Sequence, residues 1–188
     1  MPLSWNDSLY QKLNRLKRSD PTGLPRICLI GVGNDLRGDD SAGLIVARQL
    51  LAEAGFNSTP NLLILEGGPA PENQTGKLRA FRPELVLLID AAHLDEVPGT
   101  IQPIPLESID GMSASSHSLP LSMLARYIIS EFDCEVEVLG IQPAQNEVDS
   151  ELSFPVHAAV DEIVGVLATF VRASLTLSRG EFIHLIQQ

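Results

Sequence analysis

The stretch RICLIGVGNDLRGDD, at positions 26–40, decides the fold class of this chain. Its first seven residues form a short apolar run, which is typical of a strand buried in a parallel sheet. A polar loop follows and ends in the acid pair Asp39 and Asp40. From Ser41 to Ala54 the apolar residues recur at helical spacing, and Gly55 is suited to end a helix there. A strand followed directly by a helix is the repeating unit of α/β sheets.

The alternation of strand and helix continues through the rest of the chain. Further apolar strands are predicted at 62–65, 85–89 and 136–141. Helices are predicted at 119–132 and 156–175. Segment 100–106 is extended but contains two prolines, so it belongs at a sheet edge if it pairs at all. We therefore predict a three-layer α/β/α fold with a twisted, mostly parallel central sheet flanked by helices.

The 188 residues suit one domain. Within it, residues 24–175 are the predicted α/β core, residues 1–23 an N-terminal extension, and residues 176–188 a C-terminal tail. The extension and the tail are expected to be appendages to the core.

The chain is strongly acidic, with 24 acidic and 13 basic residues and a net charge of −11. This balance argues against a nucleic-acid binder and against docking on an anionic membrane. The charge is uneven: residues 1–26 carry five bases and two acids, whereas residues 84–162 carry 15 acids and one base. The N-terminus lacks an apolar signal-peptide core, and no apolar run was expected to reach the roughly 20 residues of a membrane span. A cytoplasmic location is the expectation.

The two cysteines, Cys28 and Cys134, form no metal or redox motif. Cys28 lies within an apolar run, so we expect buried thiols without a chemical role.

Ligands of open parallel sheets bind beyond the carboxyl ends of the strands, so residues that follow each apolar run are the site candidates. Asp39 and Asp40 follow the first predicted strand, Asp90 the third, and His117 precedes a predicted helix. Asp40, Asp90 and His117 together would suit zinc, nickel or ferrous iron and leave coordination positions open. Each also has an ordinary structural explanation: a helix cap, an acceptor at a strand end, or an exposed loop histidine.

Two other ligands fit the same loops less well. Gly31 and Gly33 begin a dinucleotide-binding pattern, but Leu36 stands at its third glycine position, and neighbouring acids would repel phosphate. A magnesium site of Asp39, Asp40 and Asp90, as in response-regulator receivers, lacks a lysine after Lys77 to complete it.

The remaining histidines are weaker candidates. His93 could chelate a metal with Asp90, but one loop would then supply both groups. His157 and His184 have no carboxylate partner set by the pattern and are expected on the surface or in the core. Catalysis by a serine and histidine pair has little support, since the nucleophile elbow Gly-x-Ser-x-Gly is absent from the sequence.

These motifs as a set resemble the nickel–iron hydrogenase maturation endopeptidases, particularly the branch that processes the large subunit of the formate-hydrogenlyase hydrogenase (hydrogenase 3). The matching stretches are GVGN (31–34), GDD (38–40), EGGPAPEN (66–73), LIDA (88–91), SHSLPL (116–121) and LGIQP (139–143). They occur in the family's order between about residues 26 and 175.

The resemblance implies a cytoplasmic α/β protease of the aspartyl type. Such a protease removes a short C-terminal extension from a large-subunit precursor of [NiFe] hydrogenase after nickel has been inserted. It implies metal-contacting and catalytic roles for Asp40, Asp90 and His117, with nickel carried by the substrate and zinc or another divalent ion able to occupy the site. Family members often have glycine where Ser41 stands. The competing interpretation is a nickel-binding chaperone or adaptor that uses the same ligands without cleaving.

Overall fold

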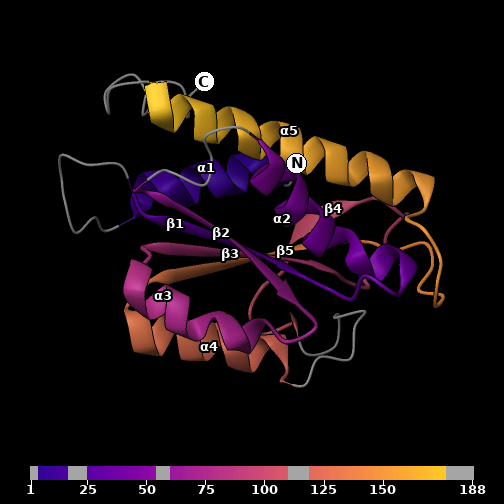
Figure 1. Ribbon diagram of the computed structural model, residues 1–188, viewed down its shortest axis with the longest axis horizontal. Helices are drawn as coiled ribbons and strands as arrows, with labels where there is room; N and C mark the ends of the chain where they lie inside the picture. Colours follow the sequence, from indigo (N-terminus) through magenta and orange to yellow (C-terminus); the bar gives the residue numbers. More distant parts are fainter. Residues whose placement is uncertain (1–3, 17–24, 54–59, 110–118, 177–188) are drawn as a thin grey trace.

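Strand β1 (Ile27–Val32) lies inside a five-stranded sheet of order β2-β1-β3-β5-β4, and all six of its residues are buried. The computed structural model describes residues 4–16, 25–53, 60–109 and 119–176 (Figure 1). Strands β2 and β3 pair in parallel with β1, and β5 pairs in parallel with β3. Only β4 is antiparallel among the described strands, and it occupies the edge.

The elements follow one another along the chain in the order of a wound α/β fold. They are α1 (Trp5–Arg15), β1, the 3₁₀-helix η1 (Gly38–Ser41), α2 (Ala42–Ala52), β2 (Leu62–Gly68), the 3₁₀-helix η3 (Pro71–Gln74), α3 (Thr75–Phe81), β3 (Leu85–Ala91), β4 (Ile101–Pro103), α4 (Leu121–Phe132), β5 (Glu135–Ile141) and α5 (Phe154–Thr176). Strands were expected at each of these five places, and the proline-containing β4 is at the edge as predicted.

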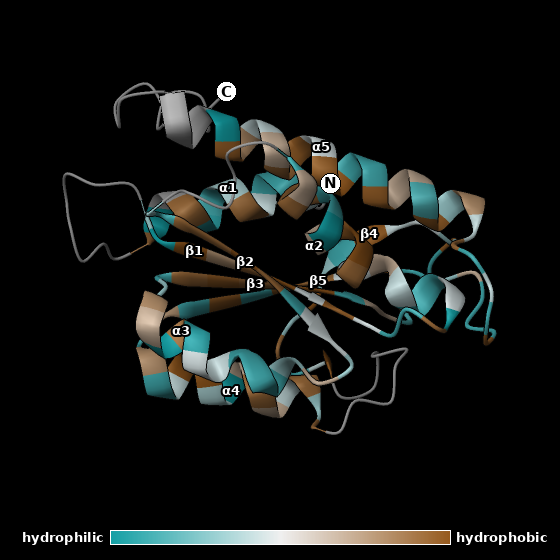
Figure 2. Ribbon diagram, in the orientation of Figure 1, coloured by the Kyte–Doolittle hydropathy of each residue, from teal (hydrophilic) through white to brown (hydrophobic). Residues whose placement is uncertain are grey.

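Helices cover both faces of the sheet, which confirms the three-layer arrangement (Figure 1). On one face α1, α2 and α5 bury a core that includes Val46, Leu87 and Ile163. On the other face α3 and α4 bury a second core that includes Leu88 and Leu124. Neighbouring residues of β3 thus point into different cores, which is why its sequence is apolar from Leu85 to Ile89 (Figure 2).

Part of the N-terminal extension packs in the core, whereas it was expected to lie outside the core. Helix α1 begins after the cap Ser4 and buries Trp5, Leu9, Leu13 and Leu16 in the core shared with α2 and α5. These four residues are spaced by four, four and three positions, so they fall on one face of the helix. The basic residues of α1, Lys12 and Arg15, lie outside this apolar face. Because the segment was interpreted by its charge, its amphipathic pattern was not recognised.

Helix α5 corrects the expectation about apolar runs. Its segment Phe154–Arg172 is long and apolar enough to cross a membrane by length and composition, although only 44% of it is buried inside the protein. Val156, Val160 and Ile163 point from this helix into the core beside α2. We therefore interpret the apolar character of α5 as that of a core helix.

Elements η3 and α3, which connect β2 to β3, were also not anticipated from the sequence. Helix α3 is seven residues long and has only Leu78 buried, so it carries little helical periodicity. It ends at Arg82, whose backbone is left-handed with φ 54°. Both cysteines are buried in the core beneath α4, as expected. Residues 55 and 177–188, on which other expectations rested, lie outside the described residues.

Candidate active site at the carboxyl edge of the sheet

A close backbone contact brings the loop after β1 to the end of β3. A Cβ atom added to Gly43, the second residue of α2, would overlap the carbonyl oxygen of Ile89 on β3. Asp90 follows Ile89 directly, and Asp40 lies three residues before Gly43. The 3₁₀-helix η1, which contains Asp40, also contacts β3. The structure therefore brings these two predicted residues together at the carboxyl edge of the sheet, where ligands of such sheets bind.

Asp40 is 1% exposed and lies inside η1. Its Oδ2 accepts a hydrogen bond of 3.1 Å from the backbone N–H of Asn34, in the loop that leaves β1. It does not cap α2: the cap position is Ser41, whose side chain donates to the carbonyl oxygen of Gly38 at 2.6 Å and makes no capping bond. The helix-cap explanation of Asp40 therefore does not hold.

Asp39, its neighbour, has a different environment, because its carboxylate is saturated by protein groups. Oδ2 accepts the backbone N–H groups of Ala144 and Gln145 at 2.8 and 3.0 Å. Oδ1 accepts the backbone N–H of Ser153 at 2.7 Å, and the hydroxyl of Ser153 donates to Oδ2 at 2.9 Å. Asp39 thus fixes the loop between β5 and α5 to the loop after β1. This structural role explains one member of the acid pair and was not foreseen.

Asp90 is also 1% exposed. It lies on β3, in register with Gly140 of β5, and the pairing of β3 with β1 reaches the preceding residue, Ile89. Because side chains alternate along a strand, Asp90 points to the same face as Leu88, whose core lies beneath α3 and α4. This is the face over which α4 packs, beginning at Leu121.

His117 lies outside the described residues, four positions before the start of α4, and so does His184. The second-choice ligand His93 is exposed just after β3. His157 is on the surface of α5, where its Nδ1 lies 3.2 Å from Asp161. Among the residues that the structure describes, no group of three or more His, Cys, Asp or Glu side chains could hold a metal ion. A metal site with three protein ligands that includes Asp40 and Asp90 would need its third ligand from outside the described residues.

The glycines of the first loop serve packing, which weakens the nucleotide interpretation. A Cβ at Gly31 would overlap the carbonyl oxygen of Gly43, and one at Gly33 would overlap that of Asp40. Gly33 also has φ +132°, a conformation that side chains disfavour. These positions are therefore occupied by the chain itself, where a dinucleotide would need to approach the backbone.

Two further polar side chains organise this edge. Gln142 is 8% exposed, and its Oε1 accepts the backbone N–H of Leu94 at 2.7 Å, which ties the loop after β3 to the end of β5. Arg48 of α2 lies 2.8 Å from Glu66 on β2 and 3.2 Å from Asp35 in the loop after β1. The hydrogen bond to Glu66 is the main cause that raises the pKa of Arg48. In the sequence, the position of Gln142 after an apolar run indicated its role. No sequence feature indicated the role of Arg48.

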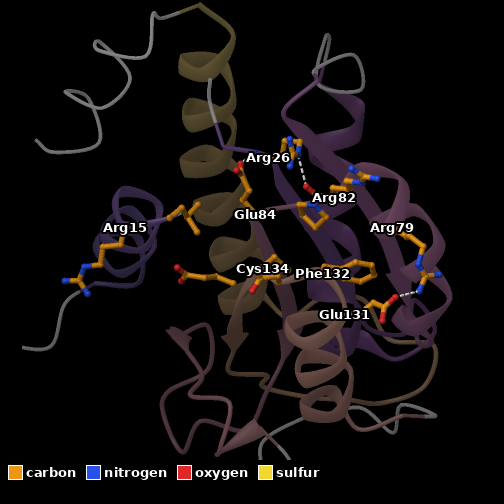
Figure 3. A pocket seen from close by; sticks show the side chains of 12 residues that line it. Arg15, Arg26, Arg79, Arg82, Glu84, Glu131, Phe132 and Cys134 are labelled. Carbon is orange, nitrogen blue, oxygen red and sulfur yellow. Dashed lines mark hydrogen bonds and ion pairs between the residues drawn. The ribbon is translucent and has the colours of Figure 1, made fainter. Parts of the chain in front are cut away.

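A cavity of about 850 Å³ lies at the opposite edge, where the strands begin (Figure 3). Its walls carry Arg26 and Glu84, which precede β1 and β3, and Cys134, which precedes β5. Four arginines in its wall are balanced by four acids, and Arg79 pairs with Glu131 at 2.5 Å. The cavity is separated from Asp40 and Asp90 by the length of the sheet, so it is not part of the candidate site.

Comparison with known proteins identifies the family of this chain. The sequence model of the hydrogenase maturation protease family (HycI) matches residues 46–169. The hydrogenase 3 maturation protease of Escherichia coli K12 is 32% identical over 136 residues, which is 72% of this chain and 84% of that protein.

Solved structures give the same result. The maturation protease HycI from Thermococcus kodakarensis KOD1 superposes with a TM-score of 0.73 at 31% identity, over 88% of this chain and 99% of that one. The solution structure of the endopeptidase HycI from Escherichia coli gives 0.63 at 31% identity, over 74% and 87% of the two chains. On the fold, the acidic carboxyl edge and these matches, the chain belongs to the hydrogenase maturation protease family and is an endopeptidase.

Proposed function

We propose that this endopeptidase removes the C-terminal extension of a nickel-loaded large-subunit precursor of [NiFe] hydrogenase, and that Asp40, Asp90 and His117 contact the nickel that the precursor carries. The observation that carries the proposal is the pair of carboxylates, Asp40 and Asp90. They come from separate segments of the chain, and each is 1% exposed at one edge of the sheet. Buried acids that are brought together at the ligand-binding edge of an α/β sheet favour a cation as their ligand.

In this proposal His117 is the third ligand. It precedes α4 by four residues, and α4 covers the face to which Asp90 points. Two carboxylates and one imidazole suit nickel, and also zinc or another divalent ion. Three protein ligands leave coordination positions for groups of the precursor.

The role of the nickel in this proposal is recognition. Hydrolysis adds water to the scissile carbonyl carbon, breaks the C–N bond, and leaves a carboxylate and an amine. Holding the nickel at the edge of the sheet would align that bond with the groups that act on it, which is a proximity effect. Such a protease would be selective for precursors that have received their metal.

The test is to incubate the purified full chain with a nickel-loaded precursor and to measure the precursor's mass. Loss of a C-terminal peptide is the expected result. Asp90→Ala and His117→Ala should each abolish this loss while their thermal unfolding stays close to that of the wild type. Retained cleavage in either variant would remove that residue from the site.

His93→Ala is the matched control, because His93 is exposed and follows the same strand as Asp90. It should cleave with a much smaller loss of rate than His117→Ala. Soaking crystals with nickel, zinc or cadmium should give one ion shared by Asp40, Asp90 and His117, and an ion bound elsewhere would contradict the ligand set.

Membership of the protease family favours cleavage over the alternative of a nickel chaperone. Nickel binding by the wild type without any cleavage of a loaded precursor would reverse this preference. We also propose that the protein acts in the cytoplasm without nucleic acid or a membrane as a partner, since its net charge of −11 disfavours both.

A further inference from the structure

Large apolar side chains are exposed on loops at the carboxyl edge of the sheet. Within the described part of the chain, six such side chains are exposed, and four of them, Leu36, Val97, Val148 and Phe154, follow the ends of β1, β3 and β5. Phe154 is the extreme case, at 89% exposure. The other two, Met123 and Tyr127, lie on α4. Single exposed apolar residues are ordinary, but a group on one edge is typical of a protein interaction surface.

Backbone contacts connect these loops into one rim. The carbonyl oxygen of Leu36 accepts the N–H of Asp149 at 2.9 Å, so the loop after β1 lies against the one after β5. A Cβ at Gly99 would overlap the carbonyl oxygen of Pro155, so the loop after β3 lies against the start of α5. Segment 148–154 joins these two contacts, and Asp39 holds its end through Ser153. The four apolar residues therefore belong to one continuous surface beside Asp40.

Acidic side chains alternate with the apolar ones on this rim. Asp95 and Glu96 precede Val97. Leu36 stands between the exposed Asp35 and Arg37, so the excess of acids lies beside the other three apolar residues. In the loop after β5 the exposed acids are Glu147, Asp149 and Glu151. The surface thus combines apolar contact area with negative charge, which fits a partner that presents apolar side chains flanked by lysine or arginine.

We infer that this rim, defined by Leu36, Val97, Val148 and Phe154 with the acids between them, is the surface on which the precursor docks, through a segment of apolar and basic side chains. The inference rests on the proposed function for the identity of the partner. The rim is continuous with the site of Asp40 and Asp90, so a precursor bound to it would have its scissile bond held beside the buried carboxylates. Docking on the rim contributes binding in the ground state and the transition state alike, and it is separate from the chemistry.

The experiment measures binding and cleavage of a nickel-loaded large-subunit precursor separately. Binding is measured by the Kd for the full chain carrying Asp90→Asn, so that the precursor is not consumed. In that background Phe154→Ser combined with Val148→Ser should raise the Kd about tenfold. In the wild-type background the same pair should raise KM by a similar factor and leave kcat unchanged.

Tyr127→Ser is the matched control, because Tyr127 is an exposed apolar residue, 42% exposed, on α4. It should leave both Kd and KM unchanged. An unchanged Kd in the rim variant, or an equal effect of the control, would overturn the docking surface while leaving the proposed cleavage intact. If the wild type binds the precursor through the rim but does not cleave it, the proposed function fails and the docking surface stands.

A second pair of variants tests the basic character of the partner segment. Glu147→Gln combined with Glu151→Gln should weaken binding severalfold at low salt and reduce the dependence of Kd on salt. Asp161→Asn, an exposed acid on α5 that pairs with His157, is the control and should keep the wild-type salt dependence. Tighter binding by the Glu147 and Glu151 pair would contradict a basic partner segment.

Discussion

Asp39 and Asp40 are adjacent, of the same chemical type and both buried, yet their surroundings give them opposite roles. Asp39 accepts four hydrogen bonds from residues more than 100 positions away, whereas Asp40 accepts a bond from Asn34, six positions before it. No sequence pattern near residue 40 contains this information, because the partners of Asp39 are Ala144, Gln145 and Ser153. The assignment of Asp40 to the site came from its position after the first strand and from the family resemblance, and the structure supplies the physical reason why Asp39 has another role.

We expect the two acids to separate in stability and activity measurements. Asp39→Ala leaves three backbone N–H groups and the Ser153 hydroxyl without their acceptor and should lower the free energy of unfolding by about 3 kcal/mol. Asp40→Asn keeps an oxygen for the N–H of Asn34, so it should change stability by less than about 1 kcal/mol while abolishing cleavage. Urea unfolding and the precursor assay check both values. A larger stability loss in Asp40→Asn than in Asp39→Ala would contradict the division of roles.

The cysteines give a prediction about pH. Burial raises the pKa of Cys134 from 9.0 to about 11, and burial likewise raises the pKa of Cys28. The folded state holds these protons while the unfolded state releases them near pH 9, so their contribution to stability is complete below pH 9 and is lost as the pH rises toward 11. Cys134→Ala should therefore lose less stability than the wild type over that interval, as followed by urea unfolding.

Thiol labelling supplies an independent check. At pH 8 an aromatic disulfide reagent should react with the folded protein far more slowly than with the urea-unfolded chain. Equal labelling rates at that pH would show that neither thiol is protected.

At the scale of elements, the strands were predictable and the short helices were not. Strands β1 and β3 are apolar at nearly every position because both of their faces are covered, and this pattern is visible in the sequence. Helix α3 buries one side chain, so its pattern was too weak to predict it. The apolar residues of α1 recur at helical spacing in the sequence, but this helix was not predicted because the segment was interpreted by its basic charge. The loops of the candidate site could be predicted from the positions of the strand ends, because parallel strands direct their carboxyl ends to one edge of the sheet.

Helix α1 should contribute to stability as a core element. Trp5 is 7% exposed, and its indole N–H donates to Glu162 of α5 at 2.8 Å. Trp5→Ala removes this bond and a large buried ring, so it should lower the free energy of unfolding by about 3–5 kcal/mol. Gln11→Ala, at an exposed position of the same helix, should change it by less than about 0.5 kcal/mol. Equal unfolding midpoints for the two variants would show that α1 is an appendage and not a core element.

At the scale of the whole molecule, the charges that sum to −11 are distributed unevenly. Bases are concentrated in the first 26 residues, whereas acids dominate the loops at the carboxyl edge. Charge of one sign around a binding edge speeds the approach of partners of the opposite sign. Composition alone argued against partners such as nucleic acid, but it could not show that the acids gather beside the site.

The rate at which the chain associates with a precursor should therefore depend on salt. Raising the ionic strength from about 0.01 M to 1 M shortens the screening length about tenfold and should slow association by an order of magnitude. Stopped-flow mixing of the Asp90→Asn chain with precursor measures this rate. A rate that is independent of salt, or that increases with it, would show that the acidic edge does not steer the partner.

The hydrogen bonds of Asp39 also determine when the site can form during synthesis. Ala144, Gln145 and Ser153 are made more than 100 residues after Asp39, and β5, which flanks β3 at Asp90, is made late as well. A nascent chain that ends before residue 153 lacks the groups that fix the acid pair in place. Proteolytic activity therefore requires synthesis of at least residues 39–153, so a shorter nascent chain of this protease should not cleave a precursor.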